Sequence, residues 1–131
     1  MATQNKCANK SFIVVDDSSM MRRIVRNCLV KNGVDNAKIQ EAGDGEEALA
    51  LLTAGRVDCV LADWNMPNCD GLTFLKRMRA IAGYEHTPFI MLSTECSRES
   101  VIEAIRTGVN AYMVKPVTPE LLKQRLDEVL T

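Results

Sequence analysis

The chain has 131 residues, of which 47% are hydrophobic and 25% charged, and its formal net charge is -1. These values fit one globular domain. They predict neither a membrane span nor a nucleic-acid partner, because the chain has no long apolar run and no broad basic field. The five cysteines show no CxxC spacing and His86 is the only histidine, so we expect free thiols in the cytoplasm rather than a zinc site.

The chain begins with a polar, aperiodic stretch, residues 1–10, which predicts a flexible arm ahead of one domain over residues 11–131. Within that domain, short apolar runs alternate five times with helical patterns. In chain order, the expected strands are residues 12–15, 38–42, 59–62, 89–92 and 111–114. Most of these runs are rich in β-branched or large apolar residues, as buried strands are, and the second run is the weakest.

Each expected strand is followed by a helix with one apolar face. The helices are expected to begin, in chain order, at Ser18 or Ser19, Asp44, Asp70, Ser97 and Thr118. The first four should end near Gly33, Gly55, Gly83 and Gly108, whereas the fifth runs on from Pro119. For the fourth helix, the expected buried face is Val101, Ile102 and Ile105, and for the first it includes Ile24.

Five β-α units in strict alternation predict an α/β protein with a parallel sheet. Strands that are apolar throughout are typical of a sheet that is buried on both faces. Right-handed crossovers then place helices on both sides of it. Since the last helix runs to the end of the sequence, we expect no second domain.

Parallel strands end at the same edge of a sheet, which is where open α/β folds bind ligands. The residues at these strand ends are all polar: Asp16, Asp17, Asp63, Ser93, Thr94 and Lys115. Each one alone has an ordinary explanation as a helix cap, a turn residue or a solvated charge. Their coincidence at one edge indicates a site.

Three neighbouring carboxylates repel one another unless a cation joins them, and oxygen ligands that accept a phosphoryl group favour Mg²⁺. Lys115 and a hydroxyl would suit the remaining phosphoryl oxygens. Asp16 and Asp17 form the expected metal pair, and Asp63, which has no acidic neighbour in the sequence, is the expected nucleophile. The predicted chemistry is Mg²⁺-dependent phosphoryl transfer to Asp63.

Four motifs, VVDDSSMMRR, VLADWNMPNCDG, FIMLSTE and AYMVKP, resemble the receiver domain of two-component response regulators over about residues 11–131. DWNMPNCDG, in a chain that ends after the fifth helix, resembles the single-domain chemotaxis regulators of that family. The resemblance implies a flavodoxin-like, doubly wound sheet of five parallel strands, in the order 2-1-3-4-5, with five helices. It also implies a stand-alone regulator that catalyses only its own Mg²⁺-dependent phosphorylation and dephosphorylation.

The resemblance also implies roles for single residues. Asp63 is the phosphorylated residue, and the main-chain carbonyl of Asn65 joins the three carboxylates as a metal ligand. Ser93 and Lys115 bind the phosphoryl group. Tyr112 is the switch aromatic, which turns inward when Ser93 is drawn to the phosphate.

Three further expectations concern the surroundings of this site. The Lys115-Pro116 bond is expected to be cis, as in the family. Asn65 and Glu95 flank the route for an attacking water and are expected to set the lifetime of the phosphate. Thr94 departs from the family, in which this position is usually Ala or Gly, and would crowd the phosphoryl group or restrict Tyr112.

The implied partners are a sensor histidine kinase, a flagellar motor switch protein and, as a further candidate, a phosphatase. The chain is expected to act as a cytoplasmic monomer. The expected contact face spans the fourth helix, the fifth strand and the fifth helix. Its candidate residues are Arg98, Ile102, Glu103, Arg106, Tyr112, Val114 and Lys123.

Other functions stay open on the residues alone. A haloacid-dehalogenase-type phosphatase also forms an aspartyl phosphate, but its first strand carries a DxD spacing, whereas Asp16 and Asp17 are adjacent and no cap insertion is present. An FMN-binding flavodoxin needs a Ser/Thr/Gly-rich loop where this chain has DDSSMM. A phosphorelay carrier, or a regulator outside motility, fits the same residues.

Overall fold

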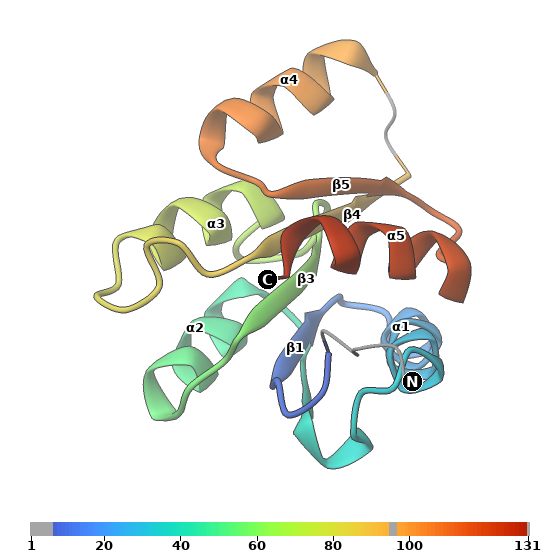
Figure 1. Cartoon of the computed structure of the whole chain (residues 1–131). Coiled ribbons are helices and arrows are strands. Elements are labelled where there is room, and N and C mark those ends of the chain that lie inside the picture. Colours follow the sequence, from blue (N-terminus) through green and yellow to red (C-terminus); the bar gives the residue numbers. More distant parts are fainter. Residues whose placement is uncertain (1–6, 95–96, 131) are drawn as a thin grey trace.

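Five parallel strands form the centre of the molecule in the order β2-β1-β3-β4-β5 (Figure 1). The computed structural model describes residues 7–94 and 97–130. In chain order, the strands are β1 (Phe12–Val15), β2 (Ile39–Ala42), β3 (Cys59–Asp63), β4 (Phe89–Ser93) and β5 (Ala111–Val114). The expected fold class and strand order are confirmed.

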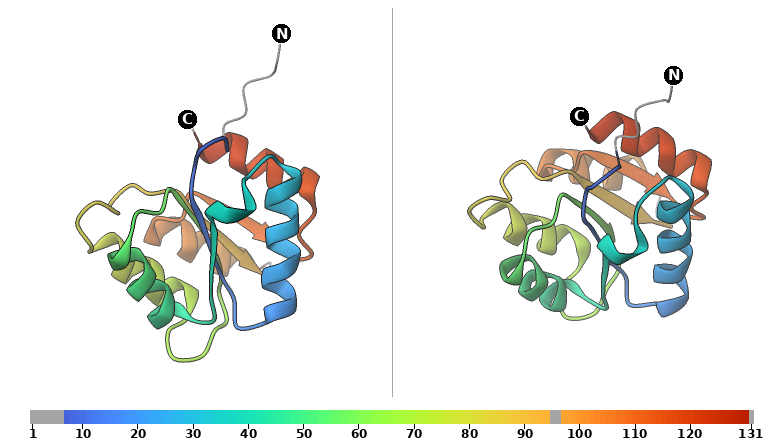
Figure 2. Two further views of the ribbon diagram at one scale, coloured as in Figure 1. Left: turned by 90° about the horizontal axis from the view of Figure 1, so that it is seen from below. Right: turned by 60° about the horizontal axis from the view of Figure 1, so that its bottom comes forward.

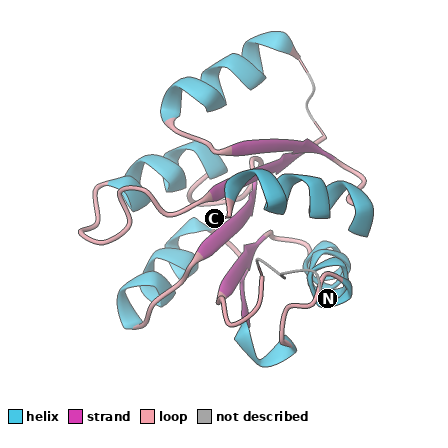
Figure 3. Ribbon diagram, in the orientation of Figure 1, coloured by secondary structure: helices cyan, strands magenta, loops and turns pink. Residues whose placement is uncertain are grey.

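Helices cover both faces of this sheet (Figure 3). In chain order, they are α1 (Ser19–Lys31), α2 (Gly45–Ala54), α3 (Gly71–Arg79), α4 (Arg98–Thr107) and α5 (Pro119–Val129), with a short 3-10 helix η1 at Asn36–Lys38. Figure 2 shows α1 and α5 on one side of the sheet and α2 and α3 on the other.

Successive residues of β1 point alternately into the two hydrophobic cores, one on each face of the sheet. Phe12 and Val14 pack toward α1 and α5, whereas Ile13 and Val15 pack toward α2 and α3. All four are fully buried, and each such side chain contributes roughly 1.5–3 kcal/mol. A strand buried on both faces requires the uninterrupted apolar run that the sequence shows.

Side-chain caps determine where the helices begin. Each cap accepts a hydrogen bond from a main-chain N–H three residues further on, and the caps are Ser18, Asp44, Asp70, Ser97 and Thr118. Ser18, rather than Ser19, caps α1. Caps of this kind contribute about 1 kcal/mol each.

The third helix ends earlier than expected, at Arg79 rather than near Gly83. The chain turns away because Tyr84 is buried and its hydroxyl lies 2.8 Å from both the Leu52 and the Gly55 carbonyl oxygens, which share its one proton. This anchors the α3–β4 connection to the end of α2.

The expected apolar face of α4 is right at Val101, which is half-buried, and wrong at its two isoleucines. Ile102 is 39% exposed and Ile105 is 59% exposed, and Ala104 is the one buried residue of this fully described helix. The inward side of α4 runs through Val101 and Ala104. Each of these residues directly precedes one of the two exposed isoleucines, Ile102 and Ile105. Ile24 of α1 is likewise 37% exposed, not buried.

The cysteines of the described chain are free thiols, as expected: Cys7, Cys28, Cys59 and Cys69 are all buried. Burial raises the pKa of the Cys59 thiol, which keeps it protonated and unreactive. Cys7 packs into the core beside α1 and α5, whereas residues 1–6 lie outside the described part, so the arm stays a prediction. No helix in the described ranges is long and apolar enough to cross a membrane.

Candidate functional site

The carboxyl ends of β1 and β3 bring three acids together. Val15 pairs with Ala62 across these strands, so Asp16 and Asp63 follow at adjacent positions on the same edge of the sheet. Asp16, Asp17 and Asp63 each offer a carboxylate oxygen, and these oxygens lie within 4.8 Å of one another. Asp16 and Asp63 are buried, whereas Asp17 is exposed.

Lys115, directly after β5, neutralises part of this charge. Its ammonium lies 3.0 Å from Asp16 Oδ2 and 3.2 Å from Asp63 Oδ1. Burial alone would lower the pKa of Lys115, but its hydrogen bond to Asp16 and the charges of both carboxylates outweigh burial and raise that pKa. Lys115 is therefore a permanent cation at neutral pH.

The acids retain an excess of negative charge. Burial raises the pKa of Asp63, and the neighbouring Asp16 and Asp17 raise it further, against the lowering effect of Lys115. With three carboxylates and one ammonium, the cluster has two uncompensated negative charges when all are ionised. An all-oxygen donor set with that charge fits a hard divalent cation, so the residues could hold a metal ion.

The main chain of Trp64, the residue after Asp63, is held through both its N–H and its carbonyl. Trp64 N–H donates to the Leu92 carbonyl at 3.1 Å, and the Trp64 carbonyl accepts from Gly71 N–H at 2.7 Å. The first residue of α3 therefore packs directly against the end of β3. A Cβ on Gly71 would overlap the Asp63 carbonyl oxygen and lie 2.9 Å from Trp64 Cα.

We therefore expect Gly71→Ala to destabilise the protein by about 1–3 kcal/mol, since the obstructing atoms are backbone and a local shift is required. Chemical denaturation would measure this loss. Gly55→Ala is the matched control, because a Cβ at Gly55 meets nothing within 4 Å. Equal stability of the two variants would contradict the close approach at Gly71.

The other expected site residues lie at the same edge, with different access. Ser93 ends β4 and is fully buried, whereas Thr94 and Asn65 are exposed. The main-chain N–H of Lys115 donates to the Ser93 carbonyl at 2.9 Å. The cis Lys115-Pro116 bond is confirmed. Glu95 falls outside the described residues.

Tyr112 lies on β5, the strand at the border of the sheet, and its ring contacts the residue that follows Asp63. The residue is half-buried, and its ring packs edge-on against Trp64, with the centroids 6.3 Å apart and the planes at 71°. Trp64 therefore adjoins Asp63 in the chain and touches Tyr112 in space. Edge-to-face pairs of this type contribute about 0.5–1.5 kcal/mol beyond burial.

The expected contact face is largely open to solvent. Its exposed members are Arg98, Ile102, Glu103, Arg106, Val114 and Lys123. Lys123 is paired with Asp127 one helical turn away, at 2.8 Å. A hollow between α3 and α4 is lined in part by Ile102, Glu103 and Arg106.

Sequence reasoning missed the arginines that bind main-chain carbonyls. Arg79 donates to the Tyr84, Thr87 and Gly108 carbonyls and to Asn110 Oδ1, which joins the α3–β4 and α4–β5 connections at the edge opposite the acids. In the sequence, Arg79 is one of several basic residues near the end of a helix and has no distinguishing spacing.

Arg22 was missed in the same way, although a signal existed. Glu41 places a charge inside an expected strand, and Arg22 and Arg26 lie one helical turn apart on the preceding helix. That pattern favours a strand-to-helix ion pair. Both arginines do bind Glu41, at 2.9 and 2.7 Å.

Residues 12–127 match the response regulator receiver domain. The chemotaxis protein CheY-3 of Vibrio cholerae is 46% identical over 121 residues, which cover 92% of each chain. The chemotaxis protein CheY homolog of Campylobacter jejuni is 48% identical over 120 residues, which cover 91% of each chain.

Solved structures of CheY proteins are also similar to this chain. The chemotaxis protein CheY4 of Vibrio cholerae is similar with a TM-score of 0.86 at 37% identity, covering 94% of this chain and 100% of that chain. A chain of the CheX-CheY complex with BeF3 and Mg²⁺ from Borrelia burgdorferi is similar with a TM-score of 0.82 at 26% identity, covering 89% of this chain and 86% of that chain.

Proposed function

The chain belongs to the response regulator receiver domain family, and on that premise we propose that it is a stand-alone response regulator phosphorylated on Asp63. The donor is a sensor histidine kinase, and the output is a change in protein binding that controls the flagellar motor during chemotaxis. The observation that carries this proposal is the cluster of Asp16, Asp17 and Asp63, with the Lys115 ammonium beside Asp16 and Asp63.

In the proposed step, a carboxylate oxygen of Asp63 attacks the phosphorus of a donor phosphohistidine. A P–O bond forms as the P–N bond breaks, and the imidazole nitrogen keeps the electron pair and takes up a proton. The Lys115 ammonium and the Ser93 hydroxyl bind phosphoryl oxygens. Their positions beside Asp63, at the ends of β5 and β4, support these roles.

Asp16, Asp17, Asp63 and the Asn65 main-chain carbonyl would hold Mg²⁺. When bound, this ion supplies charge neutralisation for the phosphoryl oxygens. Asp16 is already oriented for such a role, because its Oδ1 accepts from Ser18 N–H at 2.9 Å. Asn65 and Glu95 are proposed to control how fast water removes the phosphoryl group.

The relatives named above support the pathway. Two are chemotaxis proteins at 46–48% identity, and the Borrelia structure joins a CheY to CheX with BeF3 and Mg²⁺. We propose a kinase, a motor switch protein and a phosphatase as partners of a monomer in the cytoplasm. Tyr112 would couple phosphorylation to the exposed α4–β5–α5 face, since it contacts Trp64 beside Asp63.

Fluorescence of Trp64, the only tryptophan, tests the site. We expect Mg²⁺ to quench the emission and beryllofluoride with Mg²⁺ to quench it further, because Trp64 adjoins Asp63 and contacts Tyr112. A titration of each addition measures both changes. Emission that responds to neither would refute the proposed site.

The pathway needs its own test. A flagellar switch peptide should be retained by the protein only with beryllofluoride and Mg²⁺ present. Retention that is equal in both states, or absent from both while Trp64 still responds, would instead favour a phosphorelay carrier or a regulator outside motility.

A further inference from the structure

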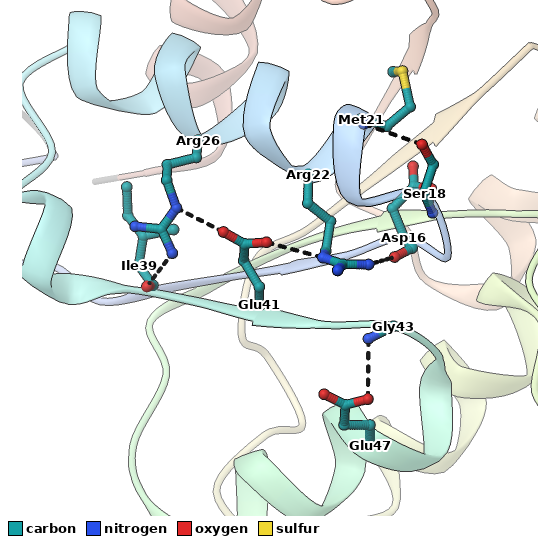
Figure 4. A network of polar contacts seen from close by, with 9 residues as sticks. All are labelled: Asp16, Ser18, Met21, Arg22, Arg26, Ile39, Glu41, Gly43 and Glu47. Carbon is teal, nitrogen blue, oxygen red and sulfur yellow. Dashed lines mark hydrogen bonds and ion pairs between the residues drawn. The ribbon is translucent and has the colours of Figure 1, made fainter.

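A charged network lies between α1 and β2, behind the acidic site (Figure 4). Glu41 accepts from Arg22 Nε at 2.9 Å through one carboxylate oxygen and from Arg26 Nε at 2.7 Å through the other. Burial would raise the pKa of Glu41, but the hydrogen bonds and charges of Arg26 and Arg22 outweigh burial and lower it. Glu41 is therefore charged at neutral pH and holds both guanidinium groups.

The two arginines differ in what else they bind. Arg26 reaches away from the acids, to the Asn36 and Ile39 carbonyls. Arg22 reaches toward them, and its Nη1 donates to the main-chain carbonyl of Asp16 at 2.6 Å. Figure 4 shows Arg22 extended between Glu41 and Asp16.

That carbonyl belongs to the peptide that joins Asp16 to Asp17. Because a peptide is planar, a bond to its oxygen also orients the N–Cα bond of Asp17. The next peptide is held as well, since Ser18 N–H donates to Asp16 Oδ1 at 2.9 Å. Asp17 therefore lies between two peptides that are each held by a side chain, although Asp17 itself is exposed.

We propose that Arg22, held in place by Glu41, is a positioning residue that orients the Asp16–Asp17 peptide and so directs the Asp17 carboxylate toward a bound divalent cation. This inference rests on the proposed function, because it assumes a cation at the three carboxylates. It assigns Arg22 no contact with the cation or with the phosphoryl group.

Because Arg22 is positively charged, the direction in which Mg²⁺ affinity changes on its removal tests the inference. Removal of a positive charge near a cation site strengthens cation binding by Coulomb's law. Loss of a residue that orients a ligand weakens binding, by about 10- to 100-fold for partners of metal ligands. The two effects act in opposite directions, so the direction of the change identifies the role.

The experiment is a Mg²⁺ titration of Trp64 fluorescence on Arg22→Ala, Arg22→Lys and Arg26→Ala. We expect the Mg²⁺ midpoint of Arg22→Ala to rise about tenfold or more. Arg22→Lys should lie between this variant and wild type, because a single ammonium replaces a fork that binds two acceptors. Phosphorylation at saturating Mg²⁺ should be nearly unchanged in Arg26→Ala.

Arg26→Ala is the matched control, since it removes the other partner of Glu41 and leaves the Asp16 carbonyl bonded. Its Mg²⁺ midpoint should stay at the wild-type value. Thermal unfolding of each variant verifies that it is folded. A midpoint for Arg22→Ala that is unchanged or lower, or one shifted equally in Arg26→Ala, would overturn the inference. A wild-type protein that ignores Mg²⁺ would refute the proposed function instead.

Discussion

Asp63→Asn should abolish phosphorylation and, in the absence of divalent cations, make the protein more stable. The first effect follows because an amide is not a nucleophile toward phosphorus. The second follows because Asp63 is buried beside two other acids, and the pKa of its carboxyl is raised by that burial and by Asp16. The neutral asparagine keeps the shape and removes the repulsion.

The raised pKa of Asp63 also determines whether the stability of the protein rises or falls with pH. A carboxyl with a raised pKa binds its proton more tightly in the folded state than in the unfolded state, so stability falls as the pH rises through the folded pKa. Metal-free wild-type protein should lose this contribution as the pH rises from the ordinary carboxyl pKa of about 4 through the raised pKa of folded Asp63. The Asp63→Asn variant should not, so the difference in melting temperature between the two should grow with pH.

Asp58→Asn is a control with the opposite expected pH dependence. Asp58 lies directly before β3, whereas Asp63 is the last residue of that strand. Burial would raise the pKa of Asp58, but bonds from the Ser11 main-chain N–H and hydroxyl outweigh burial and lower it. Asp58 therefore stabilises the fold above its unfolded pKa, and this stability is lost as the pH falls through the folded pKa. Asp58→Asn should lower the melting temperature and leave phosphorylation intact. A destabilised Asp63→Asn would contradict the repulsion among the acids.

Lys115→Met should lower the rate of phosphorylation by about 100-fold or more, the usual cost of removing a preorganised charge partner of a developing anion. It should also destabilise the metal-free protein, because Asp16 and Asp63 lose the cation that lies 3.0 and 3.2 Å from them. Methionine keeps much of the side-chain volume, so the change is chiefly one of charge.

The pH profile again distinguishes charge from packing. Lys115 lowers the pKa of Asp63, so its removal should raise that pKa further, and the fall in stability with rising pH should become steeper. The raised pKa of Lys115 itself places its own stabilising contribution at full strength below about pH 10. Mg²⁺ should restore more stability to Lys115→Met than to wild type.

Thermal unfolding across pH, with and without Mg²⁺, measures all of these differences. Lys123→Met is the control, because Lys123 is exposed and its pair with Asp127 spans one turn at the surface. That variant should unfold like wild type at every pH. A Lys115→Met protein whose stability does not depend on pH or Mg²⁺ would show that the three carboxylates do not interact as the geometry indicates.

Much of the fold could be predicted because several independent signals agreed. The apolar run before Asp63, the cap at Asp44 and the proline at position 119 each indicate an element boundary, and all three are confirmed. The convergence of Asp16, Asp63 and Lys115 then follows from parallel topology, since parallel strands end at one edge. The clustering of these charges required no knowledge of side-chain conformations.

Features that depend on the exact direction of a helix face could not be predicted. In α4, the stripes through Ala104 and Ile105 differ by one residue, and hydrophobicity favoured the wrong one. The bonds of Arg22 and Arg79 to main-chain carbonyls were also beyond prediction, because an acceptor carbonyl has no signature in the sequence. Both depend on how neighbouring elements pack.

The small buried surface of α4 bears on how easily this helix can move relative to the sheet. Strand β4 is buried at all five of its positions, whereas α4, described along its whole length, buries Ala104 alone. The sheet that carries Asp63 is thus held by burial on both faces, whereas α4 is held by little buried apolar surface and, at its C-terminal end, by the bond between Arg79 and the Gly108 carbonyl. A side chain as small as alanine contributes little when buried, so we expect a free-energy change of a few kcal/mol at the phosphorylation site to suffice to shift this helix relative to the sheet.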